Sequence, residues 1–249
     1  MKTLFAVAAL AIAGTARPAD ITVLASPAIK EAYGELVPLF ERHGNKIATT
    51  WAGTADIMKR MQAREVFDVV IAASNSLDEL IDTGKLMAGS RADVARSLVG
   101  VAVQAGAPKP DISSQEALKK TLLAAKSIGI STGPSGVYLN TLFQKIGIAE
   151  ELKPKLQVTA SGVPVGDLVA KGEAEIGFQQ VSELIHFPGI QFIGPLPAAV
   201  QQTTVFAGGV HAGSHEPDTA RDFLKFLSAP EHAALLQKHG LDLGAASPY

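Results

Sequence analysis

The sequence of 249 residues contains no cysteine, almost no excess of either charge and, after its N-terminal region, no apolar run long enough to span a bilayer. The absence of cysteine excludes disulfides, thiolate metal ligands and a cysteine nucleophile. The 22 basic and 24 acidic residues give a net charge of −2, and no basic run occurs, which argues against nucleic acid as a partner. Hydrophobic types make up 47% of the chain and aromatic types only 6%. This composition predicts an ordinary globular protein of one large domain or two smaller ones.

The N-terminal region has the pattern of a secretory signal peptide. Lys2 precedes an apolar run at 4–13, and small residues follow this run. We therefore expect residues 1–19 to be a signal peptide, with cleavage after Ala16 or Ala19. Because no cysteine follows the run, we expect no lipid anchor and predict a free protein of the periplasm. The alternative is a buried N-terminal helix.

Beyond residue 20 the chain alternates short apolar runs with amphipathic segments, the pattern of strands followed by helices. The run at 67–72 is almost wholly apolar, as in a parallel sheet covered on both faces. Ser74-Asn75-Ser76 is expected to cap the helix that follows it. The predicted fold class is α/β, with strands at 21–25, 46–51, 67–72, 98–104, 127–130, 156–159, 175–179, 191–193 and 203–210. Helices are expected at 29–42, 55–63, 77–83, 114–125, 137–146, 164–171, 182–185, 219–228 and 230–239.

The order of these elements indicates two doubly wound α/β lobes. Two sets of strand–helix units meet near 99–104, and a late strand at 203–210 is followed by two closing helices. We therefore expect the chain to cross from the first lobe to the second and back. Lobe 1 is assigned to 20–101 and 205–249 and lobe 2 to 102–204, with a ligand held between them at the carboxyl ends of the strands.

Four turns between a strand and a helix are made of residues too small to screen the backbone. The unpaired N–H groups and the dipole at a helix start favour an anion. Several such turns facing one cleft predict a binding site for a small oxyanion. Small residues also cap helices without any ligand, so a purely structural role is the alternative for each turn. The turns are Ser26-Pro27-Ala28, Gly53-Thr54-Ala55, Pro134-Ser135-Gly136 and Ser161-Gly162-Val163.

Two further features lie beside these turns. Gln179 and Gln180 follow a predicted strand and are candidates to add amide donors from the cleft wall; otherwise they form a polar strand end. Trp51, the only tryptophan, directly precedes the second turn. We expect it to pack in the core, the alternative being a lid or stacking role at the ligand.

Stretches along the whole chain after the signal peptide carry a family resemblance. They are Ile21-Thr22-Val23, Phe67-Asp68-Val69-Val70-Ile71-Ala72-Ala73, Pro134-Ser135-Gly136-Val137-Tyr138, Gly172-Glu173-Ala174-Glu175-Ile176-Gly177, Ser228-Ala229-Pro230-Glu231 and His239-Gly240. With them the chain resembles the periplasmic substrate-binding proteins of ABC importers, type II fold, and among them the molybdate-binding proteins. The resemblance implies two α/β lobes on a two-strand hinge that close over a ligand.

The resemblance also implies site residues in both lobes. Of two hydroxyl residues that hold the oxyanion in that family, the second corresponds to Thr54 and the first to Ala28, which keeps only its N–H unless Ser26 replaces the hydroxyl. The family's ligand tyrosine corresponds to Gln180. Two backbone donors of the family's second lobe correspond to Ser135 and Gly162. These departures leave two ligand classes open, a molybdate-like oxyanion and a small organic carboxylate. The expected ligand-binding residues are Ser26, Ala28, Thr54, Ser135, Gly162 and Gln180.

Enzyme and metal-centre alternatives find little support. Gly133-Pro134-Ser135-Gly136 lacks the G-x-S-x-G spacing of a nucleophile elbow. The histidines form no metal-binding helical pair and are expected at the surface: His43, His186, His211, His215, His232 and His239.

We therefore expect a non-enzymatic solute-binding protein that is a monomer without a cofactor and without direct cation ligands. It passes a small anion such as molybdate or tungstate to the membrane permease of an ABC importer. Two alternatives remain: the same fold binding an organic carboxylate, and a ligand-sensing partner of a membrane receptor.

Overall fold

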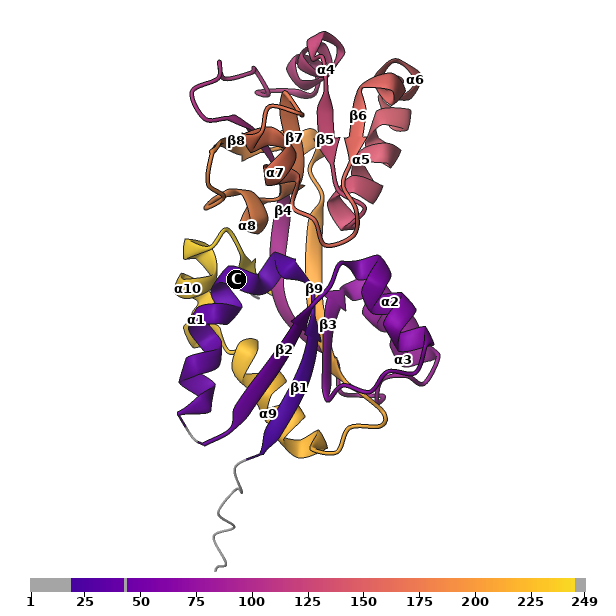
Figure 1. Ribbon diagram of the computed structural model, residues 1–249, viewed down its shortest axis with the longest axis vertical. Coiled ribbons are helices and arrows are strands. Elements are labelled where there is room, and N and C mark those ends of the chain that lie inside the picture. Colours follow the sequence, from indigo (N-terminus) through magenta and orange to yellow (C-terminus); the bar gives the residue numbers. More distant parts are fainter. Residues whose placement is uncertain (1–18, 43, 245–249) are drawn as a thin grey trace, which may run out of the picture.

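The computed structural model describes residues 19–42 and 44–244. Residues 1–18 of the predicted signal peptide, and His43, lie outside the described residues. Two lobes are stacked along the long axis of the molecule, and two long strands run between them (Figure 1). In the described part of the chain, no helix combines the length and the apolar character needed to cross a membrane.

The sheet of lobe 1 consists of β1 (Asp20–Ala25), β2 (Lys46–Trp51), β3 (Val69–Ala73), β9 (Thr203–Val210), the first half of β4 (Ala92–Gln104) and β10 (Asp242–Leu243). The strand order is β2-β1-β3-β9-β4, and β10 pairs with β4. β1, β2 and β3 are parallel, whereas β9 is antiparallel to both β3 and β4.

Helices cover both faces of this sheet because successive residues of a strand point to opposite sides. Val23 and Ile71 join one core cluster, next to α1 and α9, whereas Leu24 and Val70 join another, next to α2 and α3. The helices of this lobe are α1 (Lys30–Glu41), α2 (Thr54–Gln62), α3 (Ser74–Asp82), α9 (Pro217–Leu227) and α10 (Ala233–Lys238).

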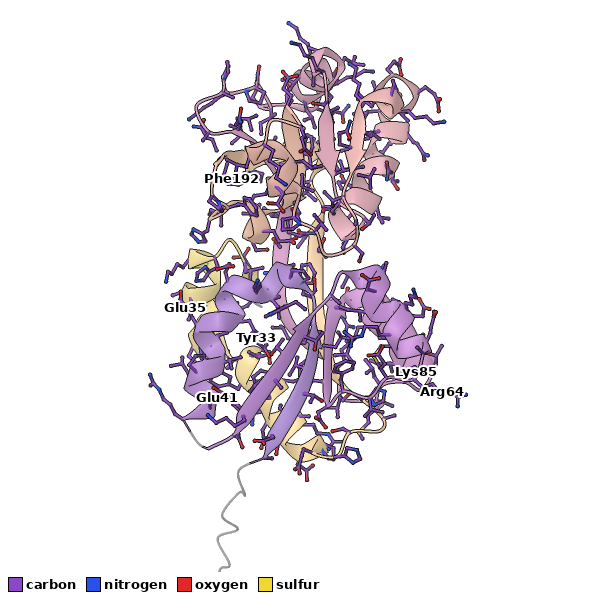
Figure 2. The ribbon with its side chains drawn as sticks, viewed as in Figure 1. Tyr33, Glu35, Glu41, Arg64, Lys85 and Phe192 are labelled. Carbon is purple, nitrogen blue, oxygen red and sulfur yellow. The ribbon has the colours of Figure 1, made fainter. Side chains whose placement is uncertain are left out.

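Trp51, at the end of β2, packs against the core cluster of lobe 1. Its ring meets that of Tyr33 edge-on, with centroids 5.1 Å apart. Tyr33 comes from α1 and lies inside the lobe, and burial raises the pKa of its hydroxyl (Figure 2). This arrangement agrees with the predicted core packing of Trp51.

Lobe 2 is built on β5 (Ile128–Ile130), β6 (Leu156–Val158), β7 (Ile176–Gln180), β8 (Ile190–Pro195) and the second half of β4. β5 is parallel to β6 and β7, whereas β7 and β8 are antiparallel to β4. Leu139 and Phe143 of α5 join Phe178 in the main core of this lobe, and Val165 and Val169 of α7 form a separate cluster. Its helices are α4 (Gln115–Ala124), α5 (Pro134–Lys145), α6 (Ala149–Leu152), α7 (Val165–Ala170) and α8 (Val181–Leu184).

β4 and β9 form the hinge between the lobes. β4 pairs with β9 up to Leu98 and with β7 from Val99 onward, so it changes partner between these two residues. The returning chain enters β9 at Thr203, directly opposite Leu98. The two α/β lobes expected from the sequence are therefore confirmed, and so is their two-strand hinge. The lobe boundaries at 101/102 and 204/205 stay predictions.

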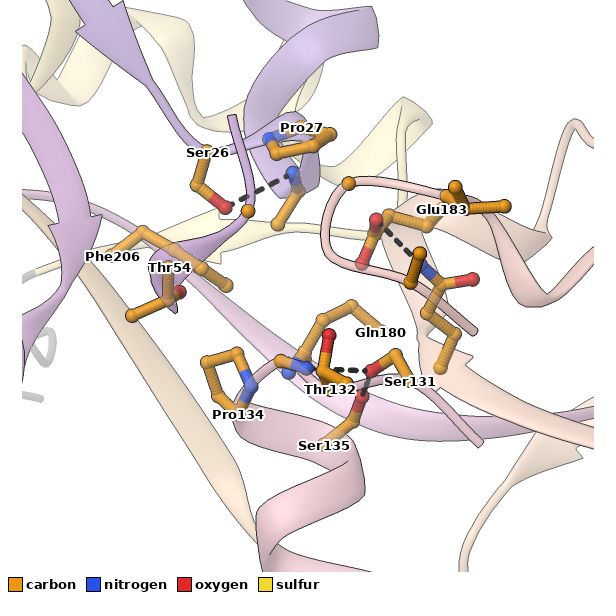
Figure 3. Close-up of a pocket in the computed structure, with 17 residues that line it drawn as sticks. Ser26, Pro27, Thr54, Ser131, Thr132, Pro134, Ser135, Gln180, Glu183 and Phe206 are labelled. Carbon is orange, nitrogen blue, oxygen red and sulfur yellow. Dashed lines mark hydrogen bonds between the residues drawn. The ribbon is translucent and has the colours of Figure 1, made fainter. Parts of the chain in front are cut away.

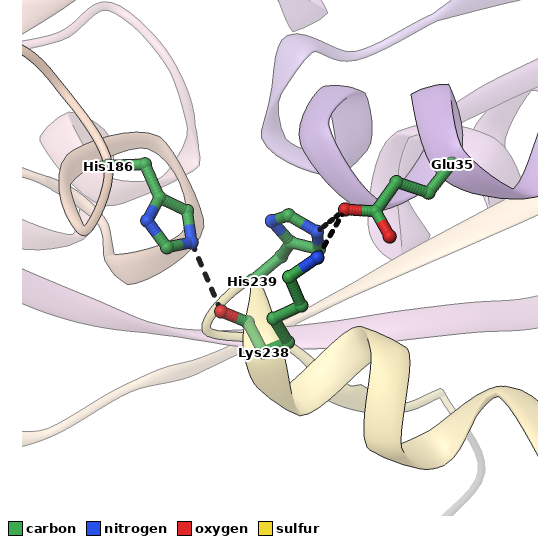
Figure 4. Close-up of polar contacts among 4 residues, drawn as sticks. All are labelled: Glu35, His186, Lys238 and His239. Carbon is green, nitrogen blue, oxygen red and sulfur yellow. Dashed lines mark hydrogen bonds and ion pairs between the residues drawn. The ribbon is translucent and has the colours of Figure 1, made fainter.

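Polar contacts outside the hinge also link the lobes (Figure 4). His186 follows α8 in lobe 2, and its Nε2 lies 3.1 Å from the carbonyl oxygen of Lys238 in lobe 1. Within lobe 1, Glu35 accepts hydrogen bonds from Lys238 Nζ at 2.7 Å and from His239 Nε2 at 2.8 Å. These two donors lower the pKa of Glu35. The rings of His186 and His239 meet edge-on across the lobe boundary, 5.2 Å apart.

The predicted surface position is wrong for two histidines. His239 is only 6% exposed and His211 only 8% exposed. His239 is held by Glu35, and His211 accepts the backbone N–H of Gly213 on Nδ1 at 3.0 Å. Folding of the chain brings Glu35 to the ring of His239, and a local turn brings Gly213 to the ring of His211.

Several predicted elements differ from the structure. The helix predicted at 137–146 is α5, which begins at Pro134, so the turn expected before it forms its first turn. β4 is longer than predicted: its first half contains Asp93 and Arg96 and is strand because β9 and β10 pair with it, with Arg96 Nε bonded to the carbonyl of Leu243 at 2.7 Å. α3 begins at Ser74, so the three residues expected to cap it form its first turn instead. The predicted helix 230–239 is divided into a 3₁₀ turn, Pro230–His232, and α10.

Candidate functional site

The turns that follow β1, β2, β5 and β6 converge with the end of β7 on a cavity of about 30 Å³ between the lobes (Figure 3). Parallel strands end at one edge of a sheet, which explains why turns far apart in the sequence meet there. All six residues expected to bind ligand line this cavity: Ser26, Ala28, Thr54, Ser135, Gly162 and Gln180. Their binding role stays a prediction.

Lobe 1 presents two helix starts to the cavity. Ser26 is the N-cap of the short 3₁₀ helix Pro27–Ile29, and its Oγ accepts the N–H of Ala28 at 3.4 Å. Gly53 is the N-cap of α2, and Thr54 is its first residue. Thr54 Oγ1 is buried and has no hydrogen-bond partner among the described residues. A buried hydroxyl without a partner is destabilising, so this atom points to a ligand.

Lobe 2 presents the start of α5. This helix begins at Pro134, and no side chain caps it. The hydroxyl of Ser131, which is not among the expected ligand-binding residues, lies 3.1 Å from the hydroxyl of Ser135 and accepts the N–H of Gly133 at 3.2 Å. Gly136 approaches the carbonyl oxygen of Ser131 so closely that a Cβ atom would overlap it. Together these residues hold the first turn of α5, with its free N–H groups, at the cavity.

The two lobes touch across the cavity at Gly53. A Cβ atom on Gly53 would overlap the hydroxyl of Ser161 and would lie 2.7 Å from the backbone nitrogen of Gly162. Gly162 itself has φ of 77°, a conformation that favours glycine. Because position 53 carries no side chain, the turn before α2 and the turn before α7 can approach this closely. The structure therefore shows the lobes in contact over the cavity.

The amide nitrogens of Gln179 and Gln180 are both bonded within the protein. Gln180 is only 1% exposed and donates from Nε2 to Thr204 Oγ1 at 3.0 Å, while its Oε1 has no partner among the described residues. Gln179 accepts the N–H of Val165 on Oε1 at 2.7 Å and donates from Nε2 to Glu183 at 2.7 Å. The amide donors expected at the cleft wall are therefore engaged elsewhere in this arrangement.

Glu183 of α8 also lines the cavity, and sequence reasoning missed it. Burial raises the pKa of its carboxyl group to about 7, although hydrogen bonds from the Gln179 side chain and the Gln180 backbone act in the opposite direction. At neutral pH this group can therefore release or accept a proton. One sequence signal placed Glu183 near the cleft: it follows Gln179 by four residues, just beyond the end of a predicted strand.

The cavity contains no basic side chain among the described residues that line it, and Glu183 is its one acidic residue there. An anion in this place would be held by backbone N–H groups, hydroxyls and helix dipoles rather than by a counter-charge. Apolar surface is also present, since Ala28, Pro134 and Phe206 line the same cavity. The site can thus hold an anion, contact a carbon skeleton and exchange a proton.

Known proteins are similar to this chain in sequence and in fold. Residues 21–242 match the family model of the bacterial extracellular solute-binding protein. The chain is 36% identical over 235 residues to an aconitate isomerase from Pseudomonas sp, a match that covers 92% of this chain and 89% of that protein. It is 24% identical over 250 residues to the molybdate-binding protein ModA of Escherichia coli (strain K12), covering 96% of this chain and 97% of that protein.

Among solved structures, the periplasmic molybdate-binding protein of Azotobacter vinelandii aligns with a TM-score of 0.76 and 18% identity, over 90% of this chain and 100% of that one. This likeness confirms the type II periplasmic binding-protein fold expected from the resemblance. With nearly every described residue inside the matched range, the chain belongs to the bacterial extracellular solute-binding proteins.

Proposed function

We propose that this protein captures a small organic di- or tricarboxylate between its lobes and delivers it to the membrane permease of an ABC importer. One cavity combines two helix starts with the carboxyl group of Glu183 and with apolar surface, and this combination supports the proposal. The signal peptide, the periplasmic location and the monomeric state belong to the same proposal.

The lining of the cavity supports a carboxylate ligand over a tetrahedral oxyanion. The starts of α2 and α5 offer N–H groups to carboxylate oxygens. Ala28 and Phe206 offer contact to a carbon skeleton, which molybdate lacks. The relative named aconitate isomerase supports the same class, since aconitate is an unsaturated tricarboxylate.

The surroundings leave room for more than one carboxylate group. A second cavity, of about 340 Å³, shares Pro27, Gly162 and Glu183 with the first. Lys30 and His186 line this second cavity, so a cationic side chain is available there. A tricarboxylate with one group at the helix starts would extend past Glu183 toward Lys30.

Isothermal titration calorimetry at pH 7 tests the proposal. The compounds are trans-aconitate, cis-aconitate, citrate, malate and succinate, against molybdate, tungstate, sulfate and phosphate. We expect at least one carboxylate to bind, and at 100 times its Kd to stabilise the protein by about 2.7 kcal/mol. Binding of molybdate or tungstate alone would favour the second candidate, an oxyanion, which the ModA relative supports. No binding by any carboxylate would contradict the proposal.

A further inference from the structure

The Glu183 side chain is held in a fixed position, as is required of a group that acts on a ligand. Gln179 cannot turn its amide group without losing two bonds, because its Oε1 accepts the N–H of Val165 at 2.7 Å while its Nε2 donates to Glu183 Oε1 at 2.7 Å. The amide therefore anchors one carboxyl oxygen of Glu183. The backbone of Gln180 is a second hydrogen-bond partner of this carboxyl group, and the side chain lines the cavity (Figure 3). Proton transfer requires a carboxyl group that is positioned in this way at the ligand.

Other groups at the cavity can bind the reacting ligand and stabilise its negative charge. α2 and α5 both begin at the cavity, so their N–H groups stabilise negative charge that develops on a carboxylate. Two buried atoms there lack partners among the described residues, Thr54 Oγ1 and Gln180 Oε1. Gln180 is almost fully buried, and its free oxygen is an independent sign that a ligand completes this site.

The groups that face Glu183 keep it able to exchange a proton. No basic residue lines the cavity itself among the described residues, and Lys30, Glu31 and His186 line the adjoining one. Burial raises the pKa of Glu183 to about 7. A general base works best when its pKa lies near the working pH.

We propose that Glu183 is a catalytic residue that moves a proton between two carbons of a bound unsaturated polycarboxylate, so that this cleft is also the active site of an isomerase. This inference rests on the proposed carboxylate ligand. In this proposal the Glu183 side chain contacts the substrate from α8, while the starts of α2 and α5 hold the substrate carboxylates.

The step needs no co-reactant. In an aconitate-like ligand, ionised Glu183 removes a proton from the CH₂ group beside the double bond. The C–H electron pair spreads over the three-carbon system and into the carboxylates, and the double bond loses its rigidity. Glu183, now protonated, returns a proton to the other end of the system, and the double bond forms in its new place. The ligand keeps its formula and Glu183 is regenerated.

Proton NMR in D₂O tests the inference with cis- and trans-aconitate as probes. With the unchanged protein we expect the two isomers to interconvert and deuterium to enter the CH₂ position. Glu183→Gln is expected to bind the probe, as calorimetry would show, but to lower the rate at least 100-fold, within the usual range for loss of an acid–base group. Glu150→Gln, at an exposed site of the same lobe, is the matched control and should keep the full rate.

Each outcome decides between the two proposals. Binding of aconitate without interconversion or exchange overturns the inference and leaves the proposed carboxylate ligand standing. Absence of aconitate binding also overturns the inference, and binding of citrate, malate or succinate would then leave the proposed carboxylate ligand standing. Glu183→Gln at the full rate also overturns the inference. If that variant does not fold, Glu183→Asp serves instead, since a carboxyl group withdrawn by one methylene should bind the probe and react more slowly.

Discussion

Buried polar atoms without a partner occur at several places in the described part of the protein, and three of them lie at or beside the cavity. Thr54 Oγ1, Ser161 Oγ and Gln180 Oε1 are buried and unpaired at or beside the cavity, among the described residues. Ser135 differs, because its hydroxyl is already bonded to Ser131. At this scale we therefore expect Thr54, rather than the Ser135 side chain, to contribute a hydroxyl to the ligand.

The substitution Thr54→Val removes the hydroxyl and keeps the shape of the side chain. We expect the Kd for the proposed carboxylate to rise at least tenfold, because a hydrogen bond to a charged group contributes about 1.5–3 kcal/mol. The melting temperature without ligand should not fall, since Thr54 Oγ1 makes no bond within the described part of the protein. Thr50→Val, at an exposed position on β2, is the control for both measurements. Unchanged affinity in the Thr54 variant would remove this residue from the site.

The Glu183 carboxyl group makes stability depend on pH. Its pKa is raised from 4.5 to about 7 in the folded protein, so the folded state holds this proton more tightly than the unfolded chain. The favourable contribution of the protonated group is present below about pH 4.5 and is lost as pH rises through about 7. We expect Glu183→Gln to reduce this loss. Urea unfolding at pH 5 and pH 8 measures the free energy of unfolding of the unchanged protein and of the variant. An equal decrease between the two pH values in both proteins would contradict the raised pKa of Glu183.

At the scale of secondary-structure elements, the helix starts are the proposed binding elements, and glycine decides how closely neighbouring segments approach them. Gly136 lets the first turn of α5 lie on the Ser131 carbonyl, whereas a Cβ atom on Gly34 in α1 would meet no other atom within 4 Å. The same residue type therefore has opposite effects in two helices. In α5 it permits a contact, and in α1 it leaves the backbone needlessly flexible.

These two glycines give a matched pair of substitutions. Gly136→Ala places a methyl group on the Ser131 carbonyl, and we expect it to lower the free energy of unfolding by about 1–3 kcal/mol, as overpacking does. Gly34→Ala meets no obstacle and should raise this free energy by about 0.4–1 kcal/mol. Urea titrations of both variants measure the changes. A stable Gly136→Ala protein with unchanged ligand affinity would mean that the close contact between residue 136 and the Ser131 carbonyl is not needed.

For the molecule as a whole, we expect ligand binding to be coupled to the approach of the two lobes. The lobes share β4 and β9, and they touch again at Gly53 over the cavity and at His186 beside α10. Contacts on both sides of the cavity enclose a ligand only when the lobes are close together. The closed arrangement therefore depends on the small size of residue 53.

Gly53→Val is expected to hold the lobes apart. The φ of Gly53 is −65°, which any residue adopts, so the change acts through the side chain that meets Ser161 and Gly162. We expect the Kd for the carboxylate to rise at least tenfold. Small-angle X-ray scattering with saturating ligand should give a larger radius of gyration than for the unchanged protein. Gly34→Ala is again the control, and a Gly53→Val protein that closes and binds normally would argue against this contact as part of closure.

The sequence by itself determined the order of strands and helices, the α/β class and the turns that build the site. These features are local: apolar runs of a given spacing form strands or helices, and small residues after a strand mark a helix start. Thr54 and Ser135 were recognisable for this reason. The first half of β4 was not, because Asp93 and Arg96 look like a polar loop until β9 and β10 supply their pairing.

The tertiary structure alone decided where Glu183 lies, which amide groups are engaged and how near the lobes come. The raised pKa of Glu183 arises from burial, which no local pattern reports. Gln179 reaches Glu183 rather than a ligand because Val165, from another element, fixes its amide. In the sequence Gly53 is only one small residue of a turn, and its contact with Gly162, more than a hundred positions later, appears only in the folded protein. Burial and long-range contacts depend on the whole chain, and they convert a set of helix starts into a site with its own acid–base group.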